Sequence, residues 1–248
     1  MTHILFIHGN FGGPSDWGAV TAAIARAVSG VSIDIPNLWT LGVDDPIGEL
    51  AARVGDARKA GKRVLVVGYS LGARLTLELL ARKDTVIDGA VLVSVNPGLT
   101  DSATRRDRIT SDSKWAEKVS NTAVRWAQIL EEWNSQAVFA GSARREGIAF
   151  TSPSEERFVR AAIARRLREW SLGALSPRWS TLETVKCPVL CLAGEHDTKF
   201  RLILESIEQL RNPRIVCGVV SGAGHRIALD CPEVLGAQVT VFLEQVGL

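Results

Sequence analysis

Short apolar runs, rich in β-branched residues, alternate with helical patterns along most of the chain, and this alternation limits the fold more than any other feature. The runs lie at 4–7, 31–35, 63–67, 87–95, 189–193 and 215–220. They are continuously apolar, which is typical of parallel strands that are covered on both faces. Helical patterns fall between most of them, at 16–27, 50–60, 71–82, 201–210 and 232–245. The sequence therefore predicts an α/β fold with a mostly parallel, doubly wound sheet.

The alternation stops once, between Pro97 and Ser180, where helical patterns at 113–133 and 154–170 occur without a convincing strand. We expect residues 98–180 to form an ordered helical lid, inserted into one α/β core made of residues 1–97 and 181–248. The lid segment holds 12 Arg and 2 Lys against 3 Asp and 7 Glu, together with five of the seven Trp residues. A basic and aromatic cover over the sheet indicates a pocket for a small, anionic and partly apolar molecule.

The overall composition excludes several other classes of protein. A net charge of +2 over 248 residues argues against a dedicated nucleic-acid binder. No apolar run approaches the roughly 20 residues of a membrane-spanning helix, and the amino-terminal residues lack the pattern of a secretory signal. We therefore expect a cytoplasmic protein with no membrane partner, and its oligomeric state is left open. Because the four cysteines lack metal-ligand spacing, we expect reduced thiols, no metal site and no cofactor.

The segment Gly68-Tyr69-Ser70-Leu71-Gly72 carries the clearest chemical signal in the chain. It follows the apolar run at 63–67 and opens a helical pattern, which is the strand, tight turn and helix of a nucleophile elbow. Glycines on both sides permit a turn too sharp for larger residues, and the turn lifts the Ser70 hydroxyl clear of the backbone. A serine hydroxyl needs a base to take its proton, so a histidine oriented by a carboxylate should follow later in the chain.

Of the four histidines, His225 is the candidate base, because it follows the last apolar run in a glycine-rich loop at 221–225. His8 belongs to the turn after the first run, and we expect it to stabilise that turn. Asp197 is the candidate acid, since it comes just past the run at 189–193, with Glu195 as its rival. Ser70, Asp197 and His225 then occur in the order that this type of elbow requires.

Three further residues are placed near the elbow by their position in the sequence. Two backbone N–H groups would form an oxyanion hole, one from Leu71 after the serine and one from Asn10 in the loop after the first run. Arg74 lies one helical turn after Ser70, where its guanidinium could bind a carboxylate.

With these features the chain resembles the α/β-hydrolase superfamily over its full length. More narrowly, it is similar to the 2-succinyl-6-hydroxy-2,4-cyclohexadiene-1-carboxylate synthases of menaquinone biosynthesis. The narrower resemblance rests on several short segments: 68–74, 97–99 with Arg105 and Arg108, 111–112 with Trp115, Trp133 with 136–139, 194–200 and 222–225. Where such proteins usually carry Asp-Leu-Pro-Gly-His-Gly after the second strand, residues 34–39 of this chain read Asp-Ile-Pro-Asn-Leu-Trp.

The resemblance implies a lyase that eliminates pyruvate from 2-succinyl-5-enolpyruvyl-6-hydroxy-3-cyclohexene-1-carboxylate, with the serine of the triad acting as base. It implies that Arg74 and Arg108 bind carboxylates and that Tyr69 and Trp133 line the pocket. Arg105 and an arginine of the second lid helix, Arg168 or Arg166, are further candidate ligands. An ester or carbon-carbon bond hydrolase with the same triad acting covalently is the alternative, and a non-catalytic ligand receptor is a third.

Overall fold

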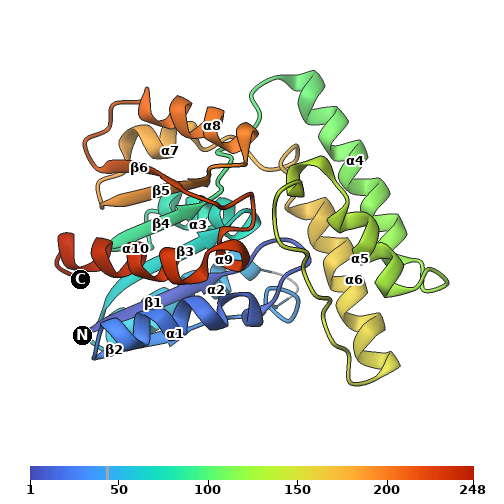
Figure 1. Ribbon diagram of the computed structural model, residues 1–248, viewed down its shortest axis with the longest axis horizontal. Helices are drawn as coiled ribbons and strands as arrows, with labels where there is room; N and C mark the ends of the chain where they lie inside the picture. The colour runs from blue at the N-terminus through green and yellow to red at the C-terminus, as the bar shows by residue number, and fades with distance from the viewer. Residues whose placement is uncertain (43–44) are drawn as a thin grey trace.

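The computed structural model describes residues 1–42 and 45–248, and within them a six-stranded, fully parallel sheet forms the centre of the molecule (Figure 1). The strands are β1 (Thr2–Ile7), β2 (Val31–Asp34), β3 (Arg63–Tyr69), β4 (Gly89–Val93), β5 (Val189–Gly194) and β6 (Ile215–Val220). They lie in the order β2-β1-β3-β4-β5-β6. The expected α/β fold is confirmed, and each strand coincides with one of the apolar runs.

Helices cover both faces of this sheet. They are α1 (Gly18–Ala27), α2 (Pro46–Lys59), α3 (Leu71–Ala81), α7 (Trp179–Thr184), α8 (Thr198–Glu208), α9 (Ile227–Asp230) and α10 (Pro232–Gln245). One apolar cluster joins α1 and α10 to residues such as Phe6, Val67 and Val91. Two others join α2, α3, α7 and α8 to the alternate residues of the same strands, Val66 and Leu92 among them. Burial on both faces explains why the strands are continuously apolar.

The chain between β4 and β5 forms α4 (Ser102–Ser120), α5 (Trp126–Asn134) and α6 (Pro153–Glu169), with α7 leading back to the sheet. Figure 1 shows α4, α5 and α6 grouped beyond the ends of the strands, on the side away from the two chain termini. Because β1 begins near the amino terminus, this is the carboxyl edge of the sheet, where parallel α/β proteins place their sites.

Two helices, α4 and α5, share the helical pattern at 113–133, and residues 121–125 separate them. The Asp101 side chain accepts a hydrogen bond from the Thr104 N–H at 2.7 Å, so α4 begins well before residue 113. At the other end the Asn121 side chain accepts from the Ala123 N–H at 3.1 Å. This local turn competes with the helix and separates α4 from α5.

Among residues 1–42 and 45–248, no helix combines the length and the apolar character that a bilayer crossing needs.

Candidate active site

Ser70 occupies a strained turn between β3 and α3, with backbone angles of φ 52° and ψ −104°. The turn brings the chain so close to β1 that a Cβ on Gly72 would lie 1.9 Å from the Ile7 carbonyl oxygen. A Cβ on Gly68 would lie 2.4 Å from the Gly72 carbonyl oxygen. The Ser70 N–H donates to the Val93 carbonyl at 2.9 Å and holds the turn against β4. These contacts explain the two glycines of the elbow.

His225 lies between Ser70 and Asp197, as the sequence predicted. Its Nδ1 is 2.6 Å from Asp197 Oδ2, and its Nε2 is 3.2 Å from Ser70 Oγ. Because an ionised carboxylate can only accept, Nδ1 carries the proton and Nε2 is left to accept from the serine hydroxyl. Burial lowers the pKa of His225, and the adjacent Asp197 only partly opposes this shift. The imidazole is therefore neutral at neutral pH and can accept a proton from Ser70.

Asp197 is held in place by the start of α8. Its other carboxylate oxygen accepts from the Phe200 N–H at 3.3 Å, and the Phe200 ring packs 4.4 Å from the His225 ring, centre to centre. The rival acid, Glu195, is exposed and accepts hydrogen bonds from the Ser221 hydroxyl and the Gly222 N–H. Glu195 thus stabilises the loop before His225 and leaves Asp197 as the carboxylate on the imidazole.

Two backbone N–H groups beside Ser70 are free of hydrogen bonds to other described residues, those of Leu71 and Asn10. Leu71 begins α3, and Asn10 belongs to the loop after β1. His8 anchors this loop, since its Nδ1 donates to the Gly9 carbonyl at 2.9 Å and its Nε2 accepts from the Leu38 N–H at 3.0 Å. Burial lowers the pKa of His8 to about 4, so its ring is neutral.

The unusual segment at 34–39 contributes to the same anchor. It supplies the Leu38 N–H to His8, and the Trp39 indole N–H donates to the Gly12 carbonyl at 2.6 Å. Two hydrogen bonds with the segment after β2 therefore hold the loop that carries the Asn10 N–H.

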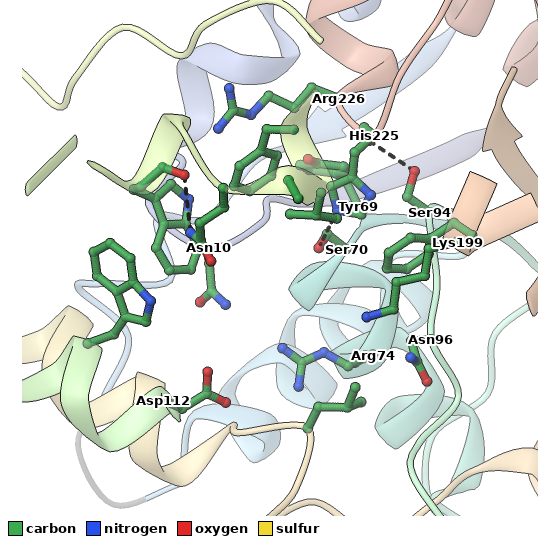
Figure 2. A pocket seen from close by; sticks show the side chains of 18 of the residues that line it. Asn10, Tyr69, Ser70, Arg74, Ser94, Asn96, Asp112, Lys199, His225 and Arg226 are labelled. Atoms are coloured by element: carbon green, nitrogen blue, oxygen red, sulfur yellow. Dashed lines mark hydrogen bonds between the residues drawn. The ribbon is translucent and has the colours of Figure 1, made fainter. Parts of the chain in front are cut away.

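A cavity of about 420 Å³ opens over Ser70 and His225 (Figure 2). Its lining comes from the turns at the carboxyl edge of the sheet and from the inserted helices. Of the predicted residues, the cavity is lined by Asn10, Tyr69, Ser70, Arg74, Arg108, Trp133 and His225. The remaining lining residues include Ser94, Asn96, Ser111, Asp112, Trp115, Gln136, Phe139, Arg145, Lys199, Phe200 and Arg226.

The cavity is rich in positive charge. Arg108 pairs with Asp112 at 2.8 Å, and Arg145 pairs with Asp16. Among the described residues, the other three cations of the lining make no ion pair: Arg74, Lys199 and Arg226. Burial is the main cause that lowers the pKa of each of them, to about 9 for Arg74 and about 10 for Arg226. Both guanidinium groups nevertheless stay charged at neutral pH.

Two of the predicted arginines lie outside the cavity. The Arg105 guanidinium is 3.5 Å from the Ala174 carbonyl, and Arg168 is exposed with its guanidinium near the Ala164 carbonyl of its own helix. The alternative, Arg166, is buried. It forms an ion pair with Glu169, and its guanidinium lies 4.7 Å from the centre of the Trp170 ring. These three arginines therefore do not line the cavity.

Sequence reasoning missed Arg145 and Arg226, and it gave no role to Lys199. Arg226 follows His225 directly, and Lys199 lies two residues after Asp197, so both could have been found as neighbours of the expected triad. Arg145 offered no such signal, because it comes from a segment without a helical pattern. Within the part of the chain that the structure describes, His, Cys, Asp and Glu side chains form no group able to hold a metal ion.

A parallel sheet with a serine, a histidine and an aspartate hydrogen-bonded at its carboxyl edge defines the α/β-hydrolase class. The chain belongs to the alpha/beta hydrolase family, whose sequence model matches residues 4–238.

More particularly, the chain is similar to a 2-succinyl-6-hydroxy-2,4-cyclohexadiene-1-carboxylate synthase of Serratia proteamaculans (strain 568). The two are 26% identical over 251 residues, which cover 98% of this chain and 94% of the relative. The chloroplastic protein PHYLLO of Arabidopsis thaliana is 27% identical over 253 residues, which cover 92% of this chain but 14% of PHYLLO. Among solved structures, MenH from S. aureus superposes with a TM-score of 0.83 at 21% identity, covering 100% of this chain and 95% of that one.

Proposed function

We propose that this protein is a lyase that releases pyruvate from 2-succinyl-5-enolpyruvyl-6-hydroxy-3-cyclohexene-1-carboxylate and forms 2-succinyl-6-hydroxy-2,4-cyclohexadiene-1-carboxylate. The similarity to the Serratia synthase over nearly the whole of both chains supports this assignment. The observation that carries it is the cavity itself, where a serine and histidine pair lies near three cations that make no ion pair with a described residue, Arg74, Lys199 and Arg226.

The reaction that the two chemical names define is an elimination across the ring. A base removes the proton on C2, which is acidified by the ketone of the succinyl group. The C2–H electron pair forms C2=C3, the C3=C4 pair moves to C4=C5, and the C5–O bond breaks. The departing enolate of pyruvate takes up a proton and becomes pyruvate, so atoms and electrons balance.

The hydrogen-bonded residues have suitable roles in this elimination. Ser70 would take the C2 proton while His225 accepts the serine proton, and Asp197 would stabilise the imidazolium that forms. The negative charge that develops on the ketone oxygen would be met by the free N–H groups of Leu71 and Asn10. A neutral His225, as its lowered pKa requires, is the form that can start the sequence.

The charges of the cavity suit this substrate, whose name specifies three carboxylates, on the ring, the succinyl chain and the enolpyruvyl group. Among the described residues, the Arg74 guanidinium has one hydrogen bond, to the Trp170 carbonyl at 2.6 Å, and Lys199 faces the same side of the cavity. With Arg108, which already pairs with Asp112, they form a cationic wall, and substrate carboxylates would neutralise Arg74 and Lys199. Residues 98–180 would act as the lid that closes this wall over the ring.

The test is pyruvate release, followed by a coupled reaction with lactate dehydrogenase and NADH. Ser70→Ala should lower kcat by about 10²- to 10⁴-fold, the range of general acid–base catalysis. Ser206→Ala, an exposed serine on α8, is the matched control and should keep full activity. Release that survives in the Ser70 variant would refute the role of this serine, and absence of release from the unmodified protein would refute the reaction.

A serine ester hydrolase is the second candidate, because a serine–histidine pair with two free N–H groups also suits acyl transfer. In that case an aryl ester such as 4-nitrophenyl acetate would leave an acyl group on Ser70, detectable as a mass increase of the intact protein. For the lyase we expect pyruvate release without an accumulated adduct.

A further inference from the structure

Arg226 lies in the cavity wall and takes no part in the steps above. It follows His225 in the loop between β6 and α9, so the backbone that places the base also places this cation. Figure 2 shows Arg226 and Arg74 on opposite sides of Ser70. The cavity therefore has positive charge on two sides of Ser70. The sequence predicts only the charge on the Arg74 side.

The guanidinium of Arg226 is buried and makes no ion pair with a carboxylate of the described residues. The whole residue is 1% exposed. Only Nη1 is hydrogen-bonded, to the Ala143 carbonyl at 2.8 Å, and Nε and Nη2 have no partner among the described residues. A buried cation is costly unless it is neutralised, and a binding ligand can supply that neutralising charge.

The acidic residues nearby are already engaged. Asp230 accepts hydrogen bonds from the backbone N–H of Ala143 at 2.6 Å and of Gly224 at 2.9 Å. Asp16 pairs with Arg145, and its carboxylate also accepts from the Gly13 N–H. Neither carboxylate makes an ion pair with Arg226, and both attract its charge only over a longer distance.

The position of Arg226 is fixed before any ligand binds. Its guanidinium lies 3.8 Å from the centre of the Phe139 ring, a cation–π contact with another residue of the cavity wall. Its backbone N–H donates to the Ser142 hydroxyl at 3.1 Å. Because the residue is 1% exposed, solvent screens its charge less than it would screen a charge at the surface.

We propose that Arg226 forms a second carboxylate subsite, across Ser70 from Arg74, Arg108 and Lys199. This proposal rests on the proposed function and adds to it that the ligand is a polyanion whose carboxylates lie on both sides of the carbon that loses its proton. Arg226 is then a residue that determines specificity, because a ligand with anionic groups on one side alone would leave it unpaired.

Binding of the enolpyruvyl substrate to the inactive Ser70→Ala protein, measured by calorimetry, tests this subsite apart from turnover. Adding Arg226→Met, which keeps the length of the side chain and removes its charge, should weaken binding by about 10- to 100-fold, the usual value of a hydrogen bond to a charged group. Arg157→Met, which removes an exposed charge outside the cavity, is the matched control and should leave the dissociation constant unchanged.

In the active enzyme, Arg226→Met should raise KM by a similar factor and keep kcat within about threefold. A loss of kcat with unchanged substrate affinity would overturn the proposal, because it would make Arg226 a support for the neighbouring His225. Unchanged affinity in the inactive background would overturn it directly. If the methionine variant does not fold, Arg226→Gln makes the same test and keeps an N–H donor for the Ala143 carbonyl.

The two proposals fail in different ways. Tight binding that depends on Arg226 without any pyruvate release would refute the lyase and retain the subsite. Pyruvate release with a substrate affinity that is the same with and without Arg226 would refute the subsite and retain the lyase.

Discussion

Arg160 of α6 holds the turn between α4 and α5, and its replacement by methionine should destabilise the protein strongly. Its residue surface is 2% exposed. Nε donates to the Val119 carbonyl at 2.8 Å, Nη1 to the Val124 carbonyl at 3.0 Å, and Nη2 to the Asn121 carbonyl. Nη1 also pairs with Glu156 at 3.0 Å. One side chain therefore satisfies three carbonyls at the point where residues 121–125 separate α4 from α5.

Methionine has nearly the same length but no donor, so Arg160→Met would leave these carbonyls unsatisfied. Hydrogen bonds to a charged group contribute about 1.5–3 kcal/mol each, and breaking a buried charged network costs about 3–5 kcal/mol in total. At about 2–4 °C per kcal/mol for a protein of this size, Tm should fall by about 6–20 °C. Because α4 carries Arg108 and Trp115, KM for a polyanionic substrate should rise as well.

Thermal unfolding followed by circular dichroism measures the effect, with Arg157→Met as the matched control. Arg157 lies one turn earlier on α6 and is exposed, and its one side-chain hydrogen bond among the described residues is to the Ser154 hydroxyl, so its loss should change Tm by less than about 2 °C. Equal shifts in the two variants, or no shift in Arg160→Met, would refute the reasoning that this guanidinium fixes the turn.

Three further predictions concern the base, the elbow and helix α2. Burial lowers the pKa of His225 below its ordinary value of 6.5, and the neutral ring is the active form. The value of kcat/KM for pyruvate release should therefore stay constant as pH falls to 6.5 and decline only below it, and a decline that begins above pH 6.5 would contradict this role of His225. Gly72→Ala should abolish soluble, active protein, because its Cβ would lie 1.9 Å from the Ile7 carbonyl oxygen. Gly55→Ala in α2, where a Cβ meets open space, should instead stabilise the protein by about 0.5–1 kcal/mol, as chemical denaturation would measure.

The fold could be predicted because its signals are local. Parallel strands covered on both faces must be continuously apolar, and the turn at Ser70 must have glycines on both sides, so sequence pattern and structure agree. The chain order of Ser70, Asp197 and His225 then limited the remaining choices to a few residues. Geometry brings these three together as expected, while their catalytic roles remain proposals for the experiments above.

The sequence could not show which arginines line the cavity, because it reveals neither which side chains are buried nor which form ion pairs. Arg168 and Arg166 lie two residues apart on α6, yet one is exposed and the other packs on Trp170. Arg145 is buried and aimed at the site by its pairing with Asp16, a contact across more than a hundred residues of chain. The interruption after α4 was missed for a similar reason, since a buried arginine from α6 secures it.

The aromatic side chains around the cavity have an optical consequence. The Trp133 ring stacks on Phe11 at 4.1 Å and meets Trp115 edge-on at 5.0 Å, and both tryptophans line the cavity. Trp17, by contrast, is fully buried against Phe6 and does not line the cavity. A ligand that enters the cavity should therefore change the fluorescence of Trp115 and Trp133, while that of Trp17 should stay constant.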